Sequence, residues 1–113
     1  MATNILNKFP ANMGKRDAYR LTKAQDVNKM QTLTGATIAP ERWVLFEDPD
    51  PKTGEIKTVL VIESNGEKFG TISKTFIDAF IDAAEEFGED LGEITVVGGK
   101  SKAGRDFITC EII

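Results

Sequence analysis

Apolar side chains recur at two different periods along this chain, and the change falls near residue 40. Between residues 22 and 35 they recur every three residues, which predicts a helix that Thr22 caps and Gly35 ends. Residues 1–16 show little periodicity and contain several asparagines, a proline and a glycine, so we expect a flexible N-terminal arm.

After residue 40 the period shortens to that of β-strands. The segment Ile56–Glu63 has apolar residues on both of its sides, as a strand buried on both faces does. The pair Asn65-Gly66 follows directly and favours a tight type I′ hairpin. The remaining strands are predicted at Glu41–Asp48, Lys68–Ile72, Glu93–Val97 and Asp106–Ile113.

A second helix is predicted between the third and fourth of these strands. Thr75 can cap it, Gly88 can end it, and its acidic residues lie opposite one apolar stripe. The stripe contains Phe76, Ile77, Phe80, Ile81, Ala84 and Phe87.

The element order is therefore a helix followed by β-β-β-α-β-β. This is the order of the OB-fold, so we predict a mainly β domain with an OB-like, five-stranded antiparallel barrel behind an N-terminal helix. The domain spans residues 17–113 and follows the arm of residues 1–16. A helix packed on an open antiparallel sheet has a similar order and stays open as an alternative.

The composition excludes several function classes. The chain of 113 residues has no histidine and one cysteine, Cys110, so it lacks the usual neutral-pH base and the four ligands of a structural zinc site. We therefore expect a binding protein and not an enzyme, without cofactor or metal. A single cysteine, no signal peptide and no long apolar run favour a cytoplasmic protein.

Charge is segregated along the chain although the net charge is only −4. Residues 1–40 carry a net +4, residues 41–75 a net −2, residues 76–97 a net −7 without any base, and residues 98–113 a net +1. Such segregation allows one face to attract phosphate while another stays acidic.

The clearest candidate for binding chemistry is the glycine-rich turn before the last strand. Lys100, Lys102 and Arg105 lie within six residues there, at the loop that clasps oligonucleotides in an OB-fold. Cations on a hairpin tip suit a phosphate backbone, and each contact releases counterions. A solvated turn without a ligand would have the same composition.

Bases of a single strand also need apolar faces on which to stack. Phe107 points away from the predicted core side of its strand, and Trp43 lies beside Arg42, so these three residues join the candidate site. Arg20 and Lys74 complete the predicted set of cations. The acidic loop Asp48–Glu55 would oppose phosphate binding if it lined the groove.

Two stretches resemble small phage-encoded single-stranded DNA-binding proteins. They are Phe69-Gly70-Thr71-Ile72-Ser73-Lys74-Thr75-Phe76 and Ser101-Lys102-Ala103-Gly104-Arg105-Asp106-Phe107-Ile108-Thr109-Cys110. The resemblance covers Phe69–Ile113 and extends loosely back to Tyr19. It implies an OB-like barrel that coats single strands in replication or recombination, with replication or recombination proteins as further partners. Many proteins that protect single strands end in a disordered acidic tail that recruits partners. Here the last residues, Cys110-Glu111-Ile112-Ile113, are predicted to lie in a strand, so we do not expect recruitment through such a tail.

Two functions stay open at this point. The first is sequence-tolerant binding of single-stranded DNA through the basic loop and stacked aromatic residues, with homo-oligomers possible through exposed strand edges. The second is a protein-interaction module or inhibitor that uses the acidic helix face of residues 76–93, in imitation of nucleic acid.

Overall fold

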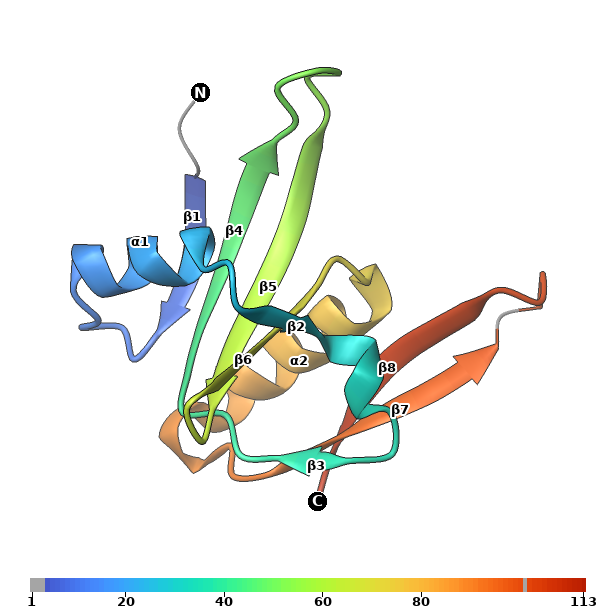
Figure 1. Cartoon of the computed structure of the whole chain (residues 1–113). Coiled ribbons are helices and arrows are strands. Elements are labelled where there is room, and N and C mark those ends of the chain that lie inside the picture. The colour runs from blue at the N-terminus through green and yellow to red at the C-terminus, as the bar shows by residue number, and fades with distance from the viewer. Residues whose placement is uncertain (1–3, 101) are drawn as a thin grey trace.

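The computed structural model describes residues 4–100 and 102–113 and confirms a mainly β protein (Figure 1). Within these residues eight strands form two sheets, accompanied by two α-helices and two short 3-10 helices. The elements are β1 (Asn4–Phe9), α1 (Lys15–Lys23), β2 (Val27–Lys29), η1 (Met30–Leu33), β3 (Thr37–Ile38), β4 (Arg42–Pro49), β5 (Ile56–Ser64), β6 (Glu67–Thr71), α2 (Lys74–Phe87), η2 (Gly88–Asp90), β7 (Ile94–Lys100) and β8 (Asp106–Ile112).

The predicted OB-like closed barrel is wrong. One sheet has five strands in the order β1-β4-β5-β6-β2, and a second sheet has three in the order β3-β7-β8. Strand β7 pairs with β3 on one side and with β8 on the other, and neither β7 nor β8 pairs with a strand of the first sheet. The antiparallel expectation also fails at β2, which runs parallel to β6. The observed arrangement has two separate sheets, with α2 packed against the second. It is closer to the alternative of a helix packed on an open antiparallel sheet.

The arm expected at residues 1–16 contains regular structure. Strand β1 pairs antiparallel with β4 from Asn4 to Phe9, and α1 begins at Lys15. The register shifts between Ile5 and Asn7, so the alternation that marks a strand is interrupted in the sequence. Residues 1–3 lie outside the described residues.

The helix predicted at residues 22–34 is also wrong, because α1 ends at Lys23. The apolar residues that follow α1 in the sequence pack into two different cores and do not form one helical stripe. Val27 in β2 packs beside α1, whereas Met30 in η1 is fully buried in the other core, against α2. A short extended segment at the sheet edge can reach both sides, which a helix of this length cannot.

Each face of the five-stranded sheet covers its own core. On one face Trp43, Ile62 and Phe69 lie opposite one another on β4, β5 and β6 and pack on α2 and the second sheet. On the other face residues such as Val44 and Val61 pack on α1. The prediction of a strand buried on both sides is therefore confirmed for Leu60–Ile62 only, since Ile56–Thr58 of the predicted segment are exposed.

Two local predictions are confirmed by backbone geometry. Asn65 and Gly66 have φ angles of 52° and 79°, as both central residues of a type I′ turn require. Helix α2 ends at Phe87 with Gly88 in the left-handed region, at φ 54°. Its cap is Ser73 and not Thr75, since the Ser73 hydroxyl accepts the Phe76 N–H at 3.4 Å.

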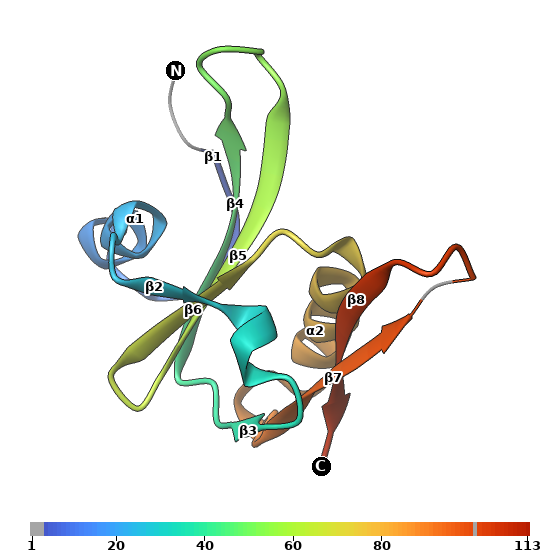
Figure 2. The same cartoon turned by 45° about the vertical axis from the view of Figure 1, so that its right-hand side comes forward.

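Two hairpins project beyond the sheets (Figures 1 and 2). The β4–β5 hairpin extends past β6, whose pairing with β5 reaches only from Ser64 to Leu60. Ile56, near its tip, is therefore 62% exposed. The β7–β8 hairpin carries the basic turn beyond the part of the second sheet in which β3 pairs with β7.

Candidate nucleic-acid interface

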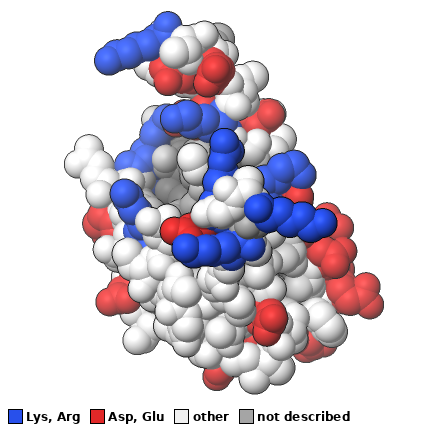
Figure 3. Space-filling view, turned by 90° about the vertical axis from the view of Figure 1, so that its right-hand side faces the viewer, with Lys and Arg blue, Asp and Glu red and all other residues white. Residues whose placement is uncertain are grey.

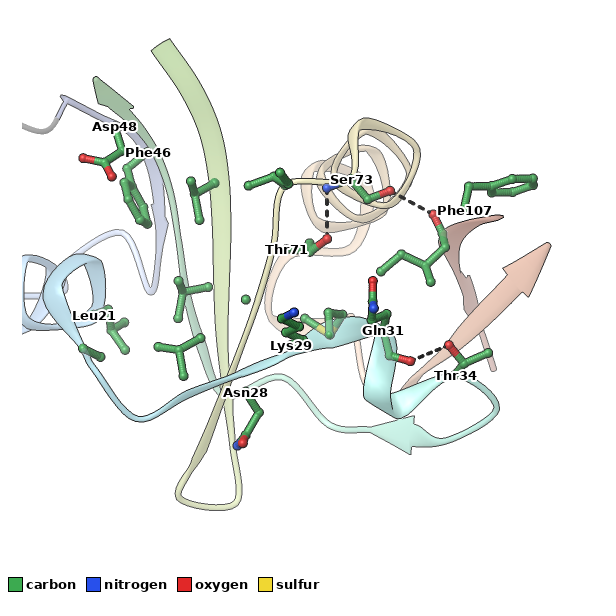
Figure 4. A pocket seen from close by; sticks show the side chains of 18 of the residues that line it. Leu21, Asn28, Lys29, Gln31, Thr34, Phe46, Asp48, Thr71, Ser73 and Phe107 are labelled. Atoms are coloured by element: carbon green, nitrogen blue, oxygen red, sulfur yellow. Dashed lines mark hydrogen bonds between the residues drawn. The ribbon is translucent and has the colours of Figure 1, made fainter. Parts of the chain in front are cut away.

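A groove of about 1000 Å³ lies between the five-stranded sheet, the β2–η1 segment and the base of the β7–β8 hairpin. Figure 4 shows Phe46 and Asp48 at one end of this groove and Phe107 at the other. Leu21 of α1 lies below Phe46, at the same end of the groove in that view. The groove thus joins segments from both halves of the chain.

The floor of the groove is apolar and is formed by side chains that also belong to the α1 core. Its members include Leu21, Val27, Phe46, Val59 and Val61. Gly70 allows the floor to close, because a Cβ at this position would lie 2.8 Å from Cγ1 of Val27. A ligand in the groove would therefore meet hydrocarbon below it.

The wall beside α2 is polar and is held by side-chain hydrogen bonds. The N–H of Ser73 donates to Oγ1 of Thr71 at 3.0 Å, and Oγ of Ser73 donates to the carbonyl of Ile108 at 3.2 Å. These bonds connect the end of β6, the start of α2 and strand β8. The hairpin is thereby fixed at its base relative to the first sheet.

Glycines let the β7–β8 hairpin lie close to η1 and to its own aromatic ring. A Cβ at Gly98 would lie 2.8 Å from Cγ2 of Thr34, and a Cβ at Gly99 would lie 2.8 Å from Cζ of Phe107, its cross-strand partner. Phe107 is half-buried as a result. Its position at the end of the groove is compatible with the predicted stacking platform.

Cationic side chains gather around a hollow on this face of the molecule, as Figure 3 shows. Among the residues of the groove and its hairpin, the cations are Lys29, Lys100, Lys102 and Arg105, and all four are exposed. Two carboxylates, those of Asp48 and Asp106, also lie in the lining. Nζ of Lys100 is 4.0 Å from a carboxylate oxygen of Asp106, a pair that a polyanion would have to rearrange.

The structure brings together four of the eight predicted site residues. Lys100, Lys102, Arg105 and Phe107 all belong to the β7–β8 hairpin or its turn. The acidic β4–β5 loop, which we expected to oppose phosphate binding, contributes Asp48 to the lining of the groove. Asp50 of that loop lies outside the lining, and its carboxylate accepts the Lys52 N–H at 2.8 Å.

Trp43 does not line the groove. It is 4% exposed, stacked on Phe9 at a centroid distance of 6.3 Å and in edge contact with Phe80 at 5.4 Å. Both neighbours cover the ring, so no base can stack on it without opening the core. Arg42 is engaged by Glu63, whose Oε1 accepts from Nε at 2.8 Å and from a terminal nitrogen at 2.6 Å.

Arg20 and Lys74 lie on helices outside the hairpin. Arg20 is exposed near the end of α1, 3.9 Å from the carboxylate of Asp17. Lys74 begins α2 and donates to Asp78 at 2.7 Å, and this hydrogen bond raises the pKa of Lys74. Neither residue lines the groove.

Sequence reasoning missed Lys29 and Gln31 as groove residues. The period of three placed both within a predicted helix, where no feature distinguishes them from other solvated positions. Their place in the lining depends on β2 and η1 lying near the β7–β8 hairpin, which only long-range packing produces.

Within residues 4–100 and 102–113, no three histidine, cysteine or acidic side chains are grouped so that they could hold a metal ion. No helix in the same ranges is long and apolar enough to span a membrane.

The pH dependence of stability is expected to report on Cys110. Burial raises the pKa of this thiol from its ordinary value of 9.0 to about 11. The unfolded chain therefore loses the proton at lower pH than the folded chain, so the free energy of unfolding falls as the pH rises from 9 toward 11. Denaturant titrations across this pH range should show that the free energy of unfolding falls less steeply in Cys110→Ala than in the native chain. An equal pH dependence of the two proteins would contradict the raised pKa of Cys110.

A comparison with known protein families, curated proteins and solved structures finds no match. The resemblance to phage single-stranded DNA-binding proteins therefore stays a prediction.

Proposed function

We propose that this chain binds single-stranded nucleic acid, in the first instance DNA, in the groove beside the β7–β8 hairpin. The observation that carries the proposal is the set of four exposed cations around an apolar groove, Lys29, Lys100, Lys102 and Arg105. The exposed acids of α2 and η2 do not line this groove. A strand could therefore approach it without meeting the most acidic segment.

The two parts of the groove suit the two parts of a nucleotide. Phosphates would lie against the cations of the rim, with release of counterions. Unpaired bases would enter the groove and contact its apolar floor or the ring of Phe107. In a duplex the bases stay stacked inside the helix and cannot make these contacts, so the arrangement favours single strands.

Binding should be dominated by electrostatics. Phe107 is the one aromatic side chain of the described groove lining that is not fully buried, so stacking contributes at one position and not at several. The biological setting implied by the resemblance is the coating of single strands in replication or recombination. Partners from those processes, and self-association on the strand, belong to the same proposal.

A salt series tests the proposal directly. A fluorescein-labelled thymidine oligonucleotide is titrated with the protein at 50–200 mM salt, and anisotropy is measured. Four phosphate contacts predict a slope of log K against log salt concentration of about −3, at −0.7 per contact on a single strand. Absence of binding at 50 mM salt would refute the proposal. Because Trp43 is buried in the core, its emission should stay constant and serves as a check on folding.

The acidic face of the α2–η2 segment supports a second candidate, a protein-interaction module or inhibitor. Every acid from Asp78 to Glu93 is exposed, and residues 76–97 contain no base. Replacing Asp82, Glu86 and Glu89 by lysine should leave DNA binding intact or strengthen it under the first proposal. Under the second, these substitutions abolish binding to a basic protein partner while oligonucleotides never bind to the native chain.

A further inference from the structure

A second groove, of about 590 Å³, lies between strand β1 and helix α1. Its lining is mainly apolar and includes Leu6 of β1 and Tyr19 of α1, which are 48% and 59% exposed. Two cations, Lys8 and Lys15, lie in the same lining, so apolar surface is exposed beside positive charge. We call this site the β1–α1 groove, and its other lining residues are Ile5, Asn7, Ala11 and Ala18.

The free edge of β1 is protected against pairing with a further strand. Strand β1 lies at one edge of the five-stranded sheet. Its register with β4 passes from Ile5 to Asn7, so Leu6 is the extra residue of a bulge. A bulge and a lysine, here Lys8, are two features by which exposed strand edges avoid pairing. The β1–α1 groove is therefore better suited to a side chain or a helix end than to an added strand.

A surface of complementary character lies at the end of α2. Phe87, the last residue of the helix, is 46% exposed. Helix α1 contains four bases and one acid, whereas α2 and η2 together contain one base and six acids. An aromatic ring suits the apolar lining of the β1–α1 groove, and carboxylates around it suit the cations of α1. The acids nearest to Phe87 in the sequence are all exposed, namely Glu85, Glu86, Glu89 and Asp90.

The two complementary surfaces lie on different sides of one molecule. Helix α1 packs on one face of the five-stranded sheet and α2 on the other, as Figure 2 shows. One chain therefore cannot place its own Phe87 in its own β1–α1 groove. A contact between the two surfaces needs a second copy, and the resulting pair still has one open groove and one open helix end. Such head-to-tail contacts continue into rings or filaments.

We propose that the β1–α1 groove binds the acidic end of α2 of a second copy, with Phe87 as the apolar anchor. Glu86 and Glu89 of one copy then lie near Lys15 and Arg16 of the other. Charge pairs at the rim of a contact orient the partners and are screened by salt. The described residues of both surfaces lie outside the lining of the groove beside the β7–β8 hairpin. The proposal therefore goes beyond nucleic-acid binding and does not depend on it.

Sedimentation velocity of the native chain, without nucleic acid, is the first test. The protein is measured over about a hundred-fold range of concentration, at about 50 mM and about 500 mM salt. The mean mass should rise with concentration at the lower salt, and the association constant should fall about ten-fold at the higher salt. A chain that stays monomeric at 50 mM salt overturns the second copy as the occupant. Association that salt leaves unchanged overturns the charge pairing.

A pair of charge reversals tests which surfaces meet. The groove variant carries Lys15→Glu and Arg16→Glu, and the helix variant carries Glu86→Lys and Glu89→Lys. Each variant alone places like charges against each other, so its association constant should fall about ten-fold or more. An equimolar mixture should associate again, because each variant then offers the opposite charge to the other. Losses that mixing does not restore overturn the pairing of these two surfaces.

The matched control for the groove variant carries Lys52→Glu and Lys57→Glu. Both lysines are exposed on the β4–β5 hairpin, outside the β1–α1 groove, and the net charge falls by the same amount. This control should associate like the native chain. An equal loss in the control would show that net charge alone governs association and would overturn the proposal.

Phe87→Ala tests the apolar anchor without any change in charge. It should weaken association about ten-fold, as truncation of an anchor residue does. Ile56→Ala is its control, because Ile56 is 62% exposed at the β4–β5 hairpin, and its effect should stay within about two-fold. Unchanged association of Phe87→Ala overturns its role as the anchor. Thermal unfolding confirms that each variant is folded, and failure of any of these tests leaves oligonucleotide binding, which is measured separately, unaffected.

Discussion

Phe80→Ala is expected to lower the free energy of unfolding by about 3–5 kcal/mol. Phe80 is fully buried in α2, and its ring contacts Trp43 edge-on at 5.4 Å and Phe76 in a stacked arrangement at 6.2 Å. Truncation removes both aromatic pairs and leaves a cavity between α2 and the five-stranded sheet. Because a domain of this size is stable by about 5–15 kcal/mol, the loss is a large share of the total.

The measurement is chemical denaturation followed by the emission of Trp43, which lies beside the cavity. Phe87→Ala is the matched control, since Phe87 is in the same helix and 46% exposed. Its cost should stay near 1 kcal/mol, because less apolar area is lost and no cavity forms. Similar losses in the two variants would contradict the core that we assign to α2.

Reversal of the hairpin charges is expected to have the largest effect on ligand binding. Replacing Lys100, Lys102 and Arg105 by glutamate should reduce the affinity for a thymidine oligonucleotide at low salt by about 100-fold or more. The three substitutions remove phosphate contacts and place acids beside Asp106, which already lies in the groove. Anisotropy titrations should also show a shallower salt dependence, by about 0.7 units of slope for each lost contact on a single strand.

A control with the same change in net charge distinguishes local contact from general repulsion. Lys15, Arg16 and Lys52 are exposed and lie outside the groove lining. Their replacement by glutamate also lowers the net charge by six and should weaken binding far less, in a way that salt screens. Equal losses in the two triple variants would show that the hairpin is not the binding surface, and the groove assignment would fail.

The local elements of the fold could be predicted from the sequence because neighbouring residues determine them. The Asn65-Gly66 turn needs two residues that tolerate positive φ, and these are the two residues present. Helix α2 has its apolar stripe, its acidic outer face and its terminal Gly88 within 15 residues. The basic turn between β7 and β8 was found in the same way, since its charge and glycine content are local properties.

Three of the strands and the arrangement of the sheets could not be predicted from such patterns. Strand β2 has three residues and β3 has two, so neither contains enough positions to show a period. Strand β1 has a shift in register that breaks its alternation. Each of the three is a strand because a partner distant in the sequence supplies its hydrogen bonds: β6 for β2, β7 for β3 and β4 for β1.

The same distinction between local pattern and long-range packing applies to the residues of the candidate site. The sequence by itself determined that three cations and Phe107 share one hairpin, because pairing around a turn follows from spacing. Only the tertiary structure decided that Trp43 lies in the core and that Lys29 and Gln31 line a groove near the hairpin. Burial of a side chain and the approach of two distant segments depend on the packing of the whole chain. A pattern of neighbouring residues carries no information about which distant surface will cover them.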